Sequence, residues 1–299
     1  MTRTDPTPLA SADTPAGTEP PAIEVNGLGL HRRWGAPILH GIDLQVPAGA
    51  VLGLVGRNGA GKSSLIRCLV GLSLPDAGQC RLLGAPSPDL PDAVRARLGY
   101  VAQTPDLFDW LTGEQHLRRF GPLYPGYDER RALRLADRLE LPLGVRAQKL
   151  SGGDQQKLSV LLALAHDPDL LVLDEPVAGL DPLTRRDFMR ALFERPPGAP
   201  PRTVLISSHL LTDLERVVSH VAFLREGRLQ LVDEWDALTE HLRLLTLPAG
   251  ASALPTRGVV QRRRLGDEER VLFDARLADA PPASGQALGL DDLFAELNA

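Results

Sequence analysis

The sequence contains little cysteine, with Cys68 and Cys80 as the two cysteines in 299 residues. Two cysteines cannot supply the ligand spacing of a structural zinc site, and a chain of this length needs no disulfide framework. We therefore expect two reduced and partly buried thiols, which is the usual condition of cysteine in the cytosol.

Long apolar runs are also missing from the sequence. No stretch of about 18 apolar residues occurs, the length that a membrane-spanning helix needs, and the longest apolar region, residues 158–173, is interrupted by His166, Asp167 and Asp169. Residues 1–21 are rich in Pro, Thr and Ala and lack the apolar stretch of a signal peptide. We expect a disordered lead-in and a chain that does not itself cross a bilayer.

An excess of positive charge is not present either. The chain has 33 Lys and Arg against 38 Asp and Glu, for a formal net charge of -5. Nucleic-acid-binding surfaces are generally basic, so we expect no nucleic-acid partner. The hydrophobic share of 43% is sufficient for one sizeable α/β core with a small appendage.

Short apolar runs alternate with helical patterns over residues 22–239. Strands are predicted at residues 23–25, 40–46, 51–55, 98–101, 170–174 and 204–206, with a hairpin formed by residues 221–224 and 228–231. A helix is predicted from Lys62 to Val70. Buried apolar strands separated by helices indicate a mostly parallel sheet with both faces covered. We therefore predict an α/β core with an antiparallel part.

The strand pattern is interrupted between about residues 105 and 165. An apolar helical stripe follows the acids Asp128 and Glu129, which suit a helix start; its members are Ala132, Leu135, Ala136 and Leu139. The helical period recurs at Leu158, Leu161, Leu162 and Ala165. We predict an inserted, mainly helical subdomain over this stretch.

The last part of the chain, residues 240–299, predicts a small C-terminal α+β appendage. It has a possible hairpin around Gly266-Asp267 and a closing helix from Asp291. Its basic run, residues 262–264, is either a binding patch or a solvated strand edge that charge protects from aggregation. The second interpretation is the commoner one.

Residues 56–63, GRNGAGKS, match the phosphate-binding loop G-x-x-x-x-G-K-[ST]. The loop follows an apolar strand and opens a helix, which is the context that supports the motif. Glycines let backbone N–H groups turn toward phosphates, and the helix adds its positive N-terminal end. We expect Lys62 to reach the β and γ phosphates of ATP and Ser63 to ligate Mg²⁺. The expected nucleotide-binding residues here are Gly56, Asn58, Gly59, Ala60, Gly61, Lys62, Ser63 and Ser64.

The apolar strand LLVLD, residues 170–174, is followed directly by a second acid. A buried strand of this kind delivers Asp174 beside the magnesium ion, where it can hold a metal-bound water. Glu175 comes next and can polarise the water that attacks the γ-phosphate. Paired with the phosphate-binding loop upstream, these acids predict nucleotide hydrolysis.

Over residues 22–235 the sequence resembles the ATP-binding subunits of ABC transporters, which implies a P-loop NTPase (RecA-like) fold. The family's motifs occur in order; they are the phosphate-binding loop, Gln103, Leu150-Ser151-Gly152-Gly153, Asp174-Glu175, Gly179-Leu180-Asp181 and His209. The most specific is Leu-Ser-Gly-Gly, which most P-loop proteins lack. Here it stands just ahead of an amphipathic helix, where N–H groups form an anion site.

The resemblance also implies residue roles and partners. Ser151, Gly152 and Gly153 would contact the γ-phosphate held by a second ATPase subunit, so that a homodimer or heterodimer encloses two nucleotides. Gln103 would sense the γ-phosphate and the metal. Asp181 would lie in the loop that crosses the dimer interface, and His209 would help Glu175 to orient the water.

Trp34 stands where the family usually has an aromatic residue that stacks on adenine. The alternative is an aromatic that belongs to the core. The signature also departs from the family's pattern, because it continues with Asp154 where a neutral residue is commoner. An acid stabilises a helix start but could repel the second subunit's phosphates, and the sequence leaves these two effects open.

Residues 124–128, 208–216 and 288–294 look most like bacterial exporter ATPases that pair with a separate membrane permease. The expected place is the cytoplasmic face of the inner membrane. An importer ATPase would use the same motor chemistry. A non-transport ABC ATPase usually has two cassettes or a long coiled coil, and this sequence has one cassette and no heptad insert. A nucleotide-gated regulatory module would not need the intact Glu175 and His209.

Overall fold

The computed structural model describes residues 20–32, 35–177, 180–195, 197–208, 214–248, 257–277 and 285–298, and the side chains of Pro182 and Leu183 are not described. Trp34, Gly179 and His209 lie outside these ranges. The description below concerns the described residues.

A six-stranded sheet forms the core, in the order β10-β9-β3-β8-β7-β6. Its strands are β3 (Val51–Val55), β6 (Leu98–Val101), β7 (Leu170–Asp174), β8 (Thr203–Ser208), β9 (His220–Arg225) and β10 (Arg228–Glu234). β6, β7, β8, β3 and β9 pair in parallel, and β10 pairs with β9 in the antiparallel sense. The predicted mostly parallel α/β core is confirmed.

Alternate residues of the central strands belong to two different hydrophobic clusters. In β7, Leu170 and Val172 join the cluster that contains Leu65 and Ile66 of α1 (Lys62–Leu69). Leu171 and Leu173 join the cluster that contains Phe188 and other residues of α6 (Pro182–Phe193). Because both faces are covered, all five residues of β7 and all six of β8 are buried. The Asp174 carboxylate therefore lies at the end of a fully buried strand and is itself buried.

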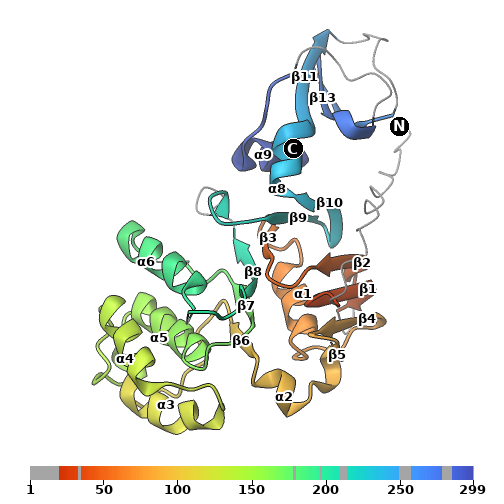
Figure 1. Ribbon diagram of the computed structural model, residues 1–299. Coiled ribbons are helices and arrows are strands. Elements are labelled where there is room, and N and C mark those ends of the chain that lie inside the picture. Colours follow the sequence, from red (N-terminus) through yellow and green to blue (C-terminus); the bar gives the residue numbers. More distant parts are fainter. Residues whose placement is uncertain are drawn as a thin grey trace.

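A second, antiparallel sheet lies beside α1, in the order β2-β1-β4-β5 (Figure 1). Its strands are β1 (Ile23–His31), β2 (Pro37–Val46), β4 (Ala77–Leu82) and β5 (Ala85–Pro86). β1 and β2 extend beyond the predicted residues 23–25 and 40–46, because their pairing continues from Ile23↔Val46 to His31↔Pro37. β4 was not predicted, since Ala77, Gly78 and Gln79 are exposed and give no alternating pattern.

Three helices lie together on one side of β6, and α2 (Asp92–Arg95) lies apart from them near β5 (Figure 1). The three are α3 (Gly113–Phe120), α4 (Glu129–Arg138) and α5 (Gly152–Leu164). Thr112 and Gln115 form a capping box at α3. Asp128 caps α4, because its carboxylate accepts hydrogen bonds from two backbone N–H groups of the first turn. These three helices share a cluster of buried residues, which includes Leu117, Ala132, Ala136, Leu158 and Leu161. Short 3-10 turns occur at Ser87–Asp89, Gly121–Leu123 and Ala147–Lys149.

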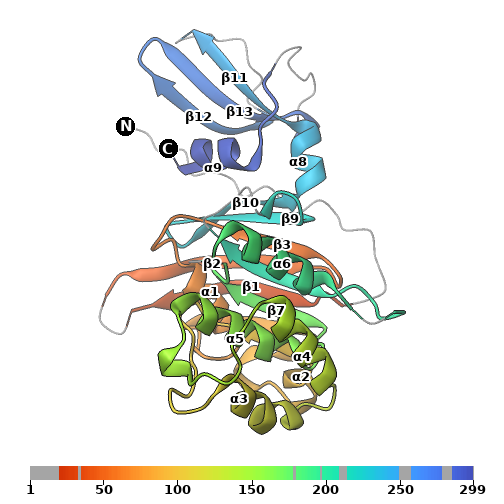
Figure 2. The same cartoon turned by 90° about the vertical axis from the view of Figure 1, so that its left-hand side faces the viewer.

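The C-terminal elements lie at the opposite end of the core sheet from these helices (Figure 2). They are α8 (Trp235–His241), β11 (Leu242–Pro248), β12 (Val259–Leu265), β13 (Glu268–Asp274), a 3-10 turn (Ala275–Leu277) and α9 (Leu290–Asn298). The strands form a sheet in the order β11-β13-β12, with the predicted hairpin turn at Gly266. The basic residues 262–264 lie on the edge strand β12, and Arg262 Nε is 3.6 Å from Glu269 Oε1.

Helix α9 attaches this sheet to the core. Leu290, Leu293 and Leu297 are buried in the core cluster that also contains α6, and Arg225 of β9 donates to the Leu297 carbonyl at 2.9 Å. Within the described residues, no helix is long and apolar enough to cross a membrane. The boundaries at residues 22, 105, 165 and 240 stay predictions.

Candidate functional site

The phosphate-binding loop joins β3 to α1 in a backbone conformation that its glycines make possible. Gly59 has φ 82° and Gly61 has φ 109°, which side-chain-bearing residues rarely adopt. At Gly56 a Cβ would lie 2.4 Å from the Leu224 carbonyl oxygen. Arg57, Asn58 and Gly59 are exposed at the loop's outer turn, whereas Gly56, Ala60 and Gly61 are buried. The glycines of the motif therefore have a steric reason at each of these positions.

Lys62 places its ammonium group between the loop and the end of β7. Its Nζ donates to the Gly56 carbonyl at 2.8 Å and lies 3.2 Å from Glu175 Oε1. The two side chains are only 5% and 6% exposed. Sequence positions 62 and 175 are thus brought into one buried ion pair, and a phosphate would compete with Glu175 for the same ammonium.

Asp174 and Glu175 are held by a serine of the neighbouring strand. Ser207 Oγ donates to Asp174 Oδ1 at 2.6 Å and accepts from the Glu175 N–H at 2.9 Å. Glu175 also has φ 48°, an uncommon conformation for a residue with a side chain. Ser207 was missed as a site residue because its contact is made across paired strands. The signal was present in the polar end of the apolar strand β8.

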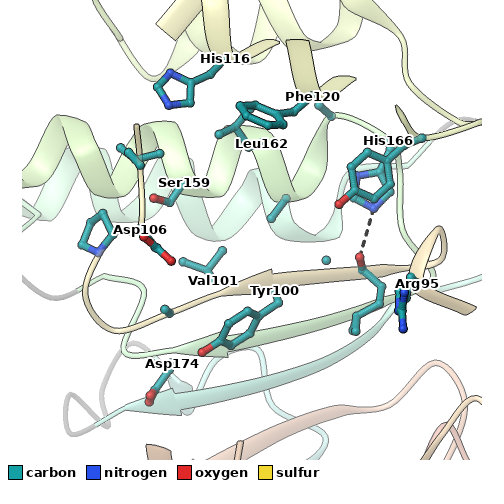
Figure 3. Close-up of a pocket in the computed structure, with 18 of the residues that line it drawn as sticks. Arg95, Tyr100, Val101, Asp106, His116, Phe120, Ser159, Leu162, His166 and Asp174 are labelled. Atoms are coloured by element: carbon teal, nitrogen blue, oxygen red, sulfur yellow. Dashed lines mark hydrogen bonds between the residues drawn. The ribbon is translucent and has the colours of Figure 1, made fainter. Parts of the chain in front are cut away.

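A cavity of about 960 Å³ runs from Asp174 to the helices α3 and α5. It is lined by Ser63, Gln103 and Asp174, the three residues expected at the metal. In Figure 3, Asp174 and Tyr100 lie at one side of this cavity and His116, Phe120 and His166 at the other. Burial, followed by the nearby negative charge of Asp174, raises the pKa of Tyr100. This tyrosine therefore stays a neutral hydroxyl beside the carboxylate.

The residues present fit a magnesium nucleotide. The hydroxyl of Ser63, the carboxylate of Asp174 and the amide of Gln103 are hard oxygen donors, which are the ligands that Mg²⁺ prefers. A glycine cradle and a buried lysine are the chemistry that phosphates require. Among the described residues no cluster of three or more His, Cys, Asp or Glu could hold a metal.

The signature residues lie at the start of α5, apart from this cavity. Ser151 caps the helix, since its Oγ accepts from the Asp154 N–H at 3.1 Å. Ser151 and Gly152 are exposed and Gly153 is partly exposed. None of the three lines the cavity that contains Ser63 and Asp174. Ser63 is the one residue of the phosphate-binding loop that lines this cavity, and among the described residues no hydrogen bond joins Ser151, Gly152 or Gly153 to that loop.

Asp181 is the remaining described residue of the expected site. It is exposed at the start of α6, and its Oδ1 accepts from the Thr184 N–H at 3.1 Å. The roles expected for Trp34 and His209 concern residues outside the described ranges. Those roles, like the nucleotide contacts of every other site residue, stay predictions.

Comparison with known proteins identifies the family. A model of the family described as ABC transporter matches residues 39–178. The nickel import ATP-binding protein NikO of Rhodobacter capsulatus is 36% identical over 223 residues, which cover 70% of this chain and 87% of that protein. The chain belongs to the ABC transporter family. The resemblance drawn from the motifs is confirmed, and the matched residues include β3, β6 and β7 of the core sheet and the helices α3, α4 and α5.

Two further comparisons place the chain within this family. The Nod factor export ATP-binding protein I of Paraburkholderia xenovorans is 35% identical over 200 residues, which are 64% of each chain. The chain thus spans slightly less than two thirds of that relative. A solved structure described as the ATP-binding subunit of an ABC transporter superposes with a TM-score of 0.65 at 30% identity, covering 73% of this chain and 92% of that one. The predicted P-loop NTPase fold is confirmed.

Proposed function

We propose that the chain binds ATP with Mg²⁺, hydrolyses it, and thereby energises a separate membrane permease. The observation that supports this most is the buried contact between Lys62 and Glu175, with Asp174 beside it. Such a pair places the cation that phosphates need and a base for water within a few ångströms of each other. An ATPase needs both groups at this place.

Each site residue has a defined task in this proposal. The loop N–H groups and Lys62 bind the phosphates, while Ser63, Gln103 and Asp174 hold Mg²⁺. The ion neutralises charge on the phosphates when it is bound. Glu175 takes up the proton of the attacking water at a carboxylate oxygen. Ser207 keeps the two acids in position through its bonds to Asp174 and to the Glu175 backbone.

The distance of the signature from this site supports a second ATPase subunit. Ser151 is exposed at a helix start, where N–H groups favour an anion. Ser151 makes no hydrogen bond to the phosphate-binding loop of its own chain among the described residues, and we propose that the phosphate it binds belongs to a partner. The proposed assembly is a nucleotide sandwich, either of two copies or of this chain with another ATPase.

The permease is proposed to dock on the segment between Gln103 and Lys149. Large apolar side chains of this segment are unusually exposed, with Trp110 at 61%, Leu123 at 72% and Phe108 at 44%. Phe108 and Leu123 also line the cavity that reaches Asp174. Exposed apolar side chains of this kind suit an interaction site, and the cavity that two of them line also contains the candidate metal ligands.

Export is the direction proposed for the permease, on the cytoplasmic face of the membrane. The supporting observation is the likeness to a Nod factor export protein and to the tail pattern of exporter ATPases at residues 288–294. The match to the nickel import protein spans a larger share of that relative, 87% against 64% for the Nod factor export protein. Import is therefore the second candidate. Identifying the membrane protein that copurifies with the chain separates the two.

The ATPase proposal is tested by Lys62→Ala, with Lys149→Ala as the matched control. Lys149 is exposed, so its loss should leave ATP affinity and turnover unchanged. Lys62→Ala should remove most ATP binding, because the charge opposite the β and γ phosphates is lost. Equilibrium binding of a fluorescent ATP analogue and phosphate release measure both effects. Normal binding and turnover in Lys62→Ala would contradict the site assignment.

A further inference from the structure

The hydroxyl group of the signature serine is already engaged within its own chain. Ser151 Oγ lies 2.7 Å from Asp154 Oδ2. An ionised carboxylate only accepts hydrogen bonds, so the serine must be the donor. The same oxygen accepts from the Asp154 N–H at 3.1 Å. The single proton of Ser151 therefore points at Asp154.

The Asp154 carboxylate is also partly neutralised from the same helix. Lys157 Nζ lies 3.2 Å from Asp154 Oδ1, and the two side chains are 13% and 25% exposed. One carboxylate oxygen thus accepts the hydrogen bond from the serine hydroxyl, and the other faces the lysine ammonium group. The three side chains therefore interact with one another at the start of α5.

We infer that Asp154 is a positioning residue that holds the Ser151 hydroxyl back from a partner's nucleotide and so opposes closure of the ATP sandwich. This inference rests on the proposed function, in which Ser151 meets the γ-phosphate of a second subunit. To donate to that phosphate, the hydroxyl must turn away from Asp154. Asp154 Oδ2 then loses its donor while a second anion approaches.

Both consequences act in the same direction. A hydrogen bond to a charged group is among the stronger ones that a protein makes, and like charges at close range repel each other. A neutral amide at position 154 would remove the repulsion and would compete less for the serine proton. Lys157 limits the penalty, because its charge stays close to the incoming phosphate after the hydroxyl has turned.

The test compares dimer formation in a background that binds ATP without hydrolysing it. Glu175→Gln supplies this background, and light scattering over a range of protein concentrations gives the dimer dissociation constant with Mg-ATP. Adding Asp154→Asn should lower that constant by about tenfold to a hundredfold, since one charged hydrogen bond contributes roughly a factor of ten and a dimer of two copies contains two of them. Adding Lys157→Gln instead should raise it.

Two controls separate this role from a general effect on the helix. Asp236→Asn makes the same chemical change in the first turn of α8, at an exposed residue, and should leave the constant unchanged. Measured against Ser151→Ala alone, adding Asp154→Asn should give a clearly smaller gain, because no serine hydroxyl remains to be released and only the repulsion is relieved. A purely structural effect of Asp154 would be equally large in the Ser151→Ala background and would also appear with Mg-ADP.

Each outcome decides the matter. A several-fold tighter dimer with Asp154→Asn, dependent on Ser151 and on ATP, supports the inference. Equal or weaker dimers with Asp154→Asn overturn it while leaving the sandwich intact. If neither Glu175→Gln alone nor Glu175→Gln with Asp154→Asn dimerises at saturating Mg-ATP, both the inference and the proposed sandwich are overturned. Glu175→Gln alone distinguishes the two failures, because it dimerises whenever the sandwich is correct.

Discussion

Replacing Glu175 with Gln separates the two tasks that the structure gives to this side chain. The carboxylate lies 3.2 Å from Lys62 Nζ with both groups almost fully buried, and it is also the proposed base. Gln keeps the shape and can still accept a hydrogen bond from Lys62, but it carries no charge. The variant should therefore lose hydrolysis, keep ATP binding and be less stable without nucleotide.

The size of each effect follows from the contacts. Loss of a positioned general base should reduce turnover by about 10²–10⁴-fold. Loss of the charge in the buried bond to Lys62 should cost roughly 2–3 kcal/mol of unfolding free energy, or roughly 4–10 °C in Tm. Mg-ATP should return more stability to the variant than to the wild type, because its phosphates supply the anion that Lys62 has lost.

The assays are phosphate release and thermal unfolding with and without Mg-ATP. Glu226→Gln is a matched control: Glu226 has φ 48°, the same as Glu175, but its side chain is 80% exposed. The control should change neither turnover nor Tm. The reasoning is refuted if Glu175→Gln turns over ATP within about twofold of the wild type, which is far above the range for a lost base, or if Mg-ATP raises the Tm of both proteins equally.

Three further predictions follow from other contacts. Ser207→Ala should lower turnover about tenfold at nearly unchanged ATP affinity, because Asp174 and the Glu175 backbone lose one hydrogen bond each; steady-state kinetics show this as a kcat effect. Burial raises the pKa of the Cys68 thiol to about 11, so the folded state holds its proton more tightly than the unfolded state. This contribution to stability is present below pH 9 and lost as the pH rises through 11, which urea unfolding at several pH values measures, with Cys68→Ser as the comparison. A cysteine at Leu123 should crosslink to the permease and one at Arg264 should not, and crosslinks from Arg264 alone would contradict the docking proposal.

The parts of the site that sequence could predict are those set by neighbouring residues. The turn at Gly59 and Gly61, the helix that starts at Lys62 and the buried strand that ends at Asp174 each follow from a short local pattern. Together with the other motifs, Leu-Ser-Gly-Gly above all, their order along the chain was enough to indicate the family. Local patterns also placed the acids Asp128 and Glu129 at a helix start and the hairpin turn at Gly227 correctly.

Contacts between distant residues could not be predicted in this way. The strand β4 has three exposed residues at its start and is a strand because β1 pairs with it. Ser207 reaches Asp174 only because β7 and β8 lie side by side in register, with Asp174 opposite Ser207. Helix α6 was not predicted either. Burial on α6, as at Phe188, is set by α6 packing against the sheet rather than by any local signal.

The signature shows what a structure adds when the sequence leaves two effects open. From sequence alone, Asp154 could either stabilise the start of α5 or repel a phosphate. In the structure one carboxylate has both effects, because Asp154 lies in the first turn of α5 and also accepts the hydrogen bond from the Ser151 hydroxyl. Stability of the free chain and readiness to close therefore oppose each other at this residue. Substituting Asp154 should make the single chain slightly less stable by unfolding measurements and the ATP-bound dimer tighter, a combination that neither effect would produce alone.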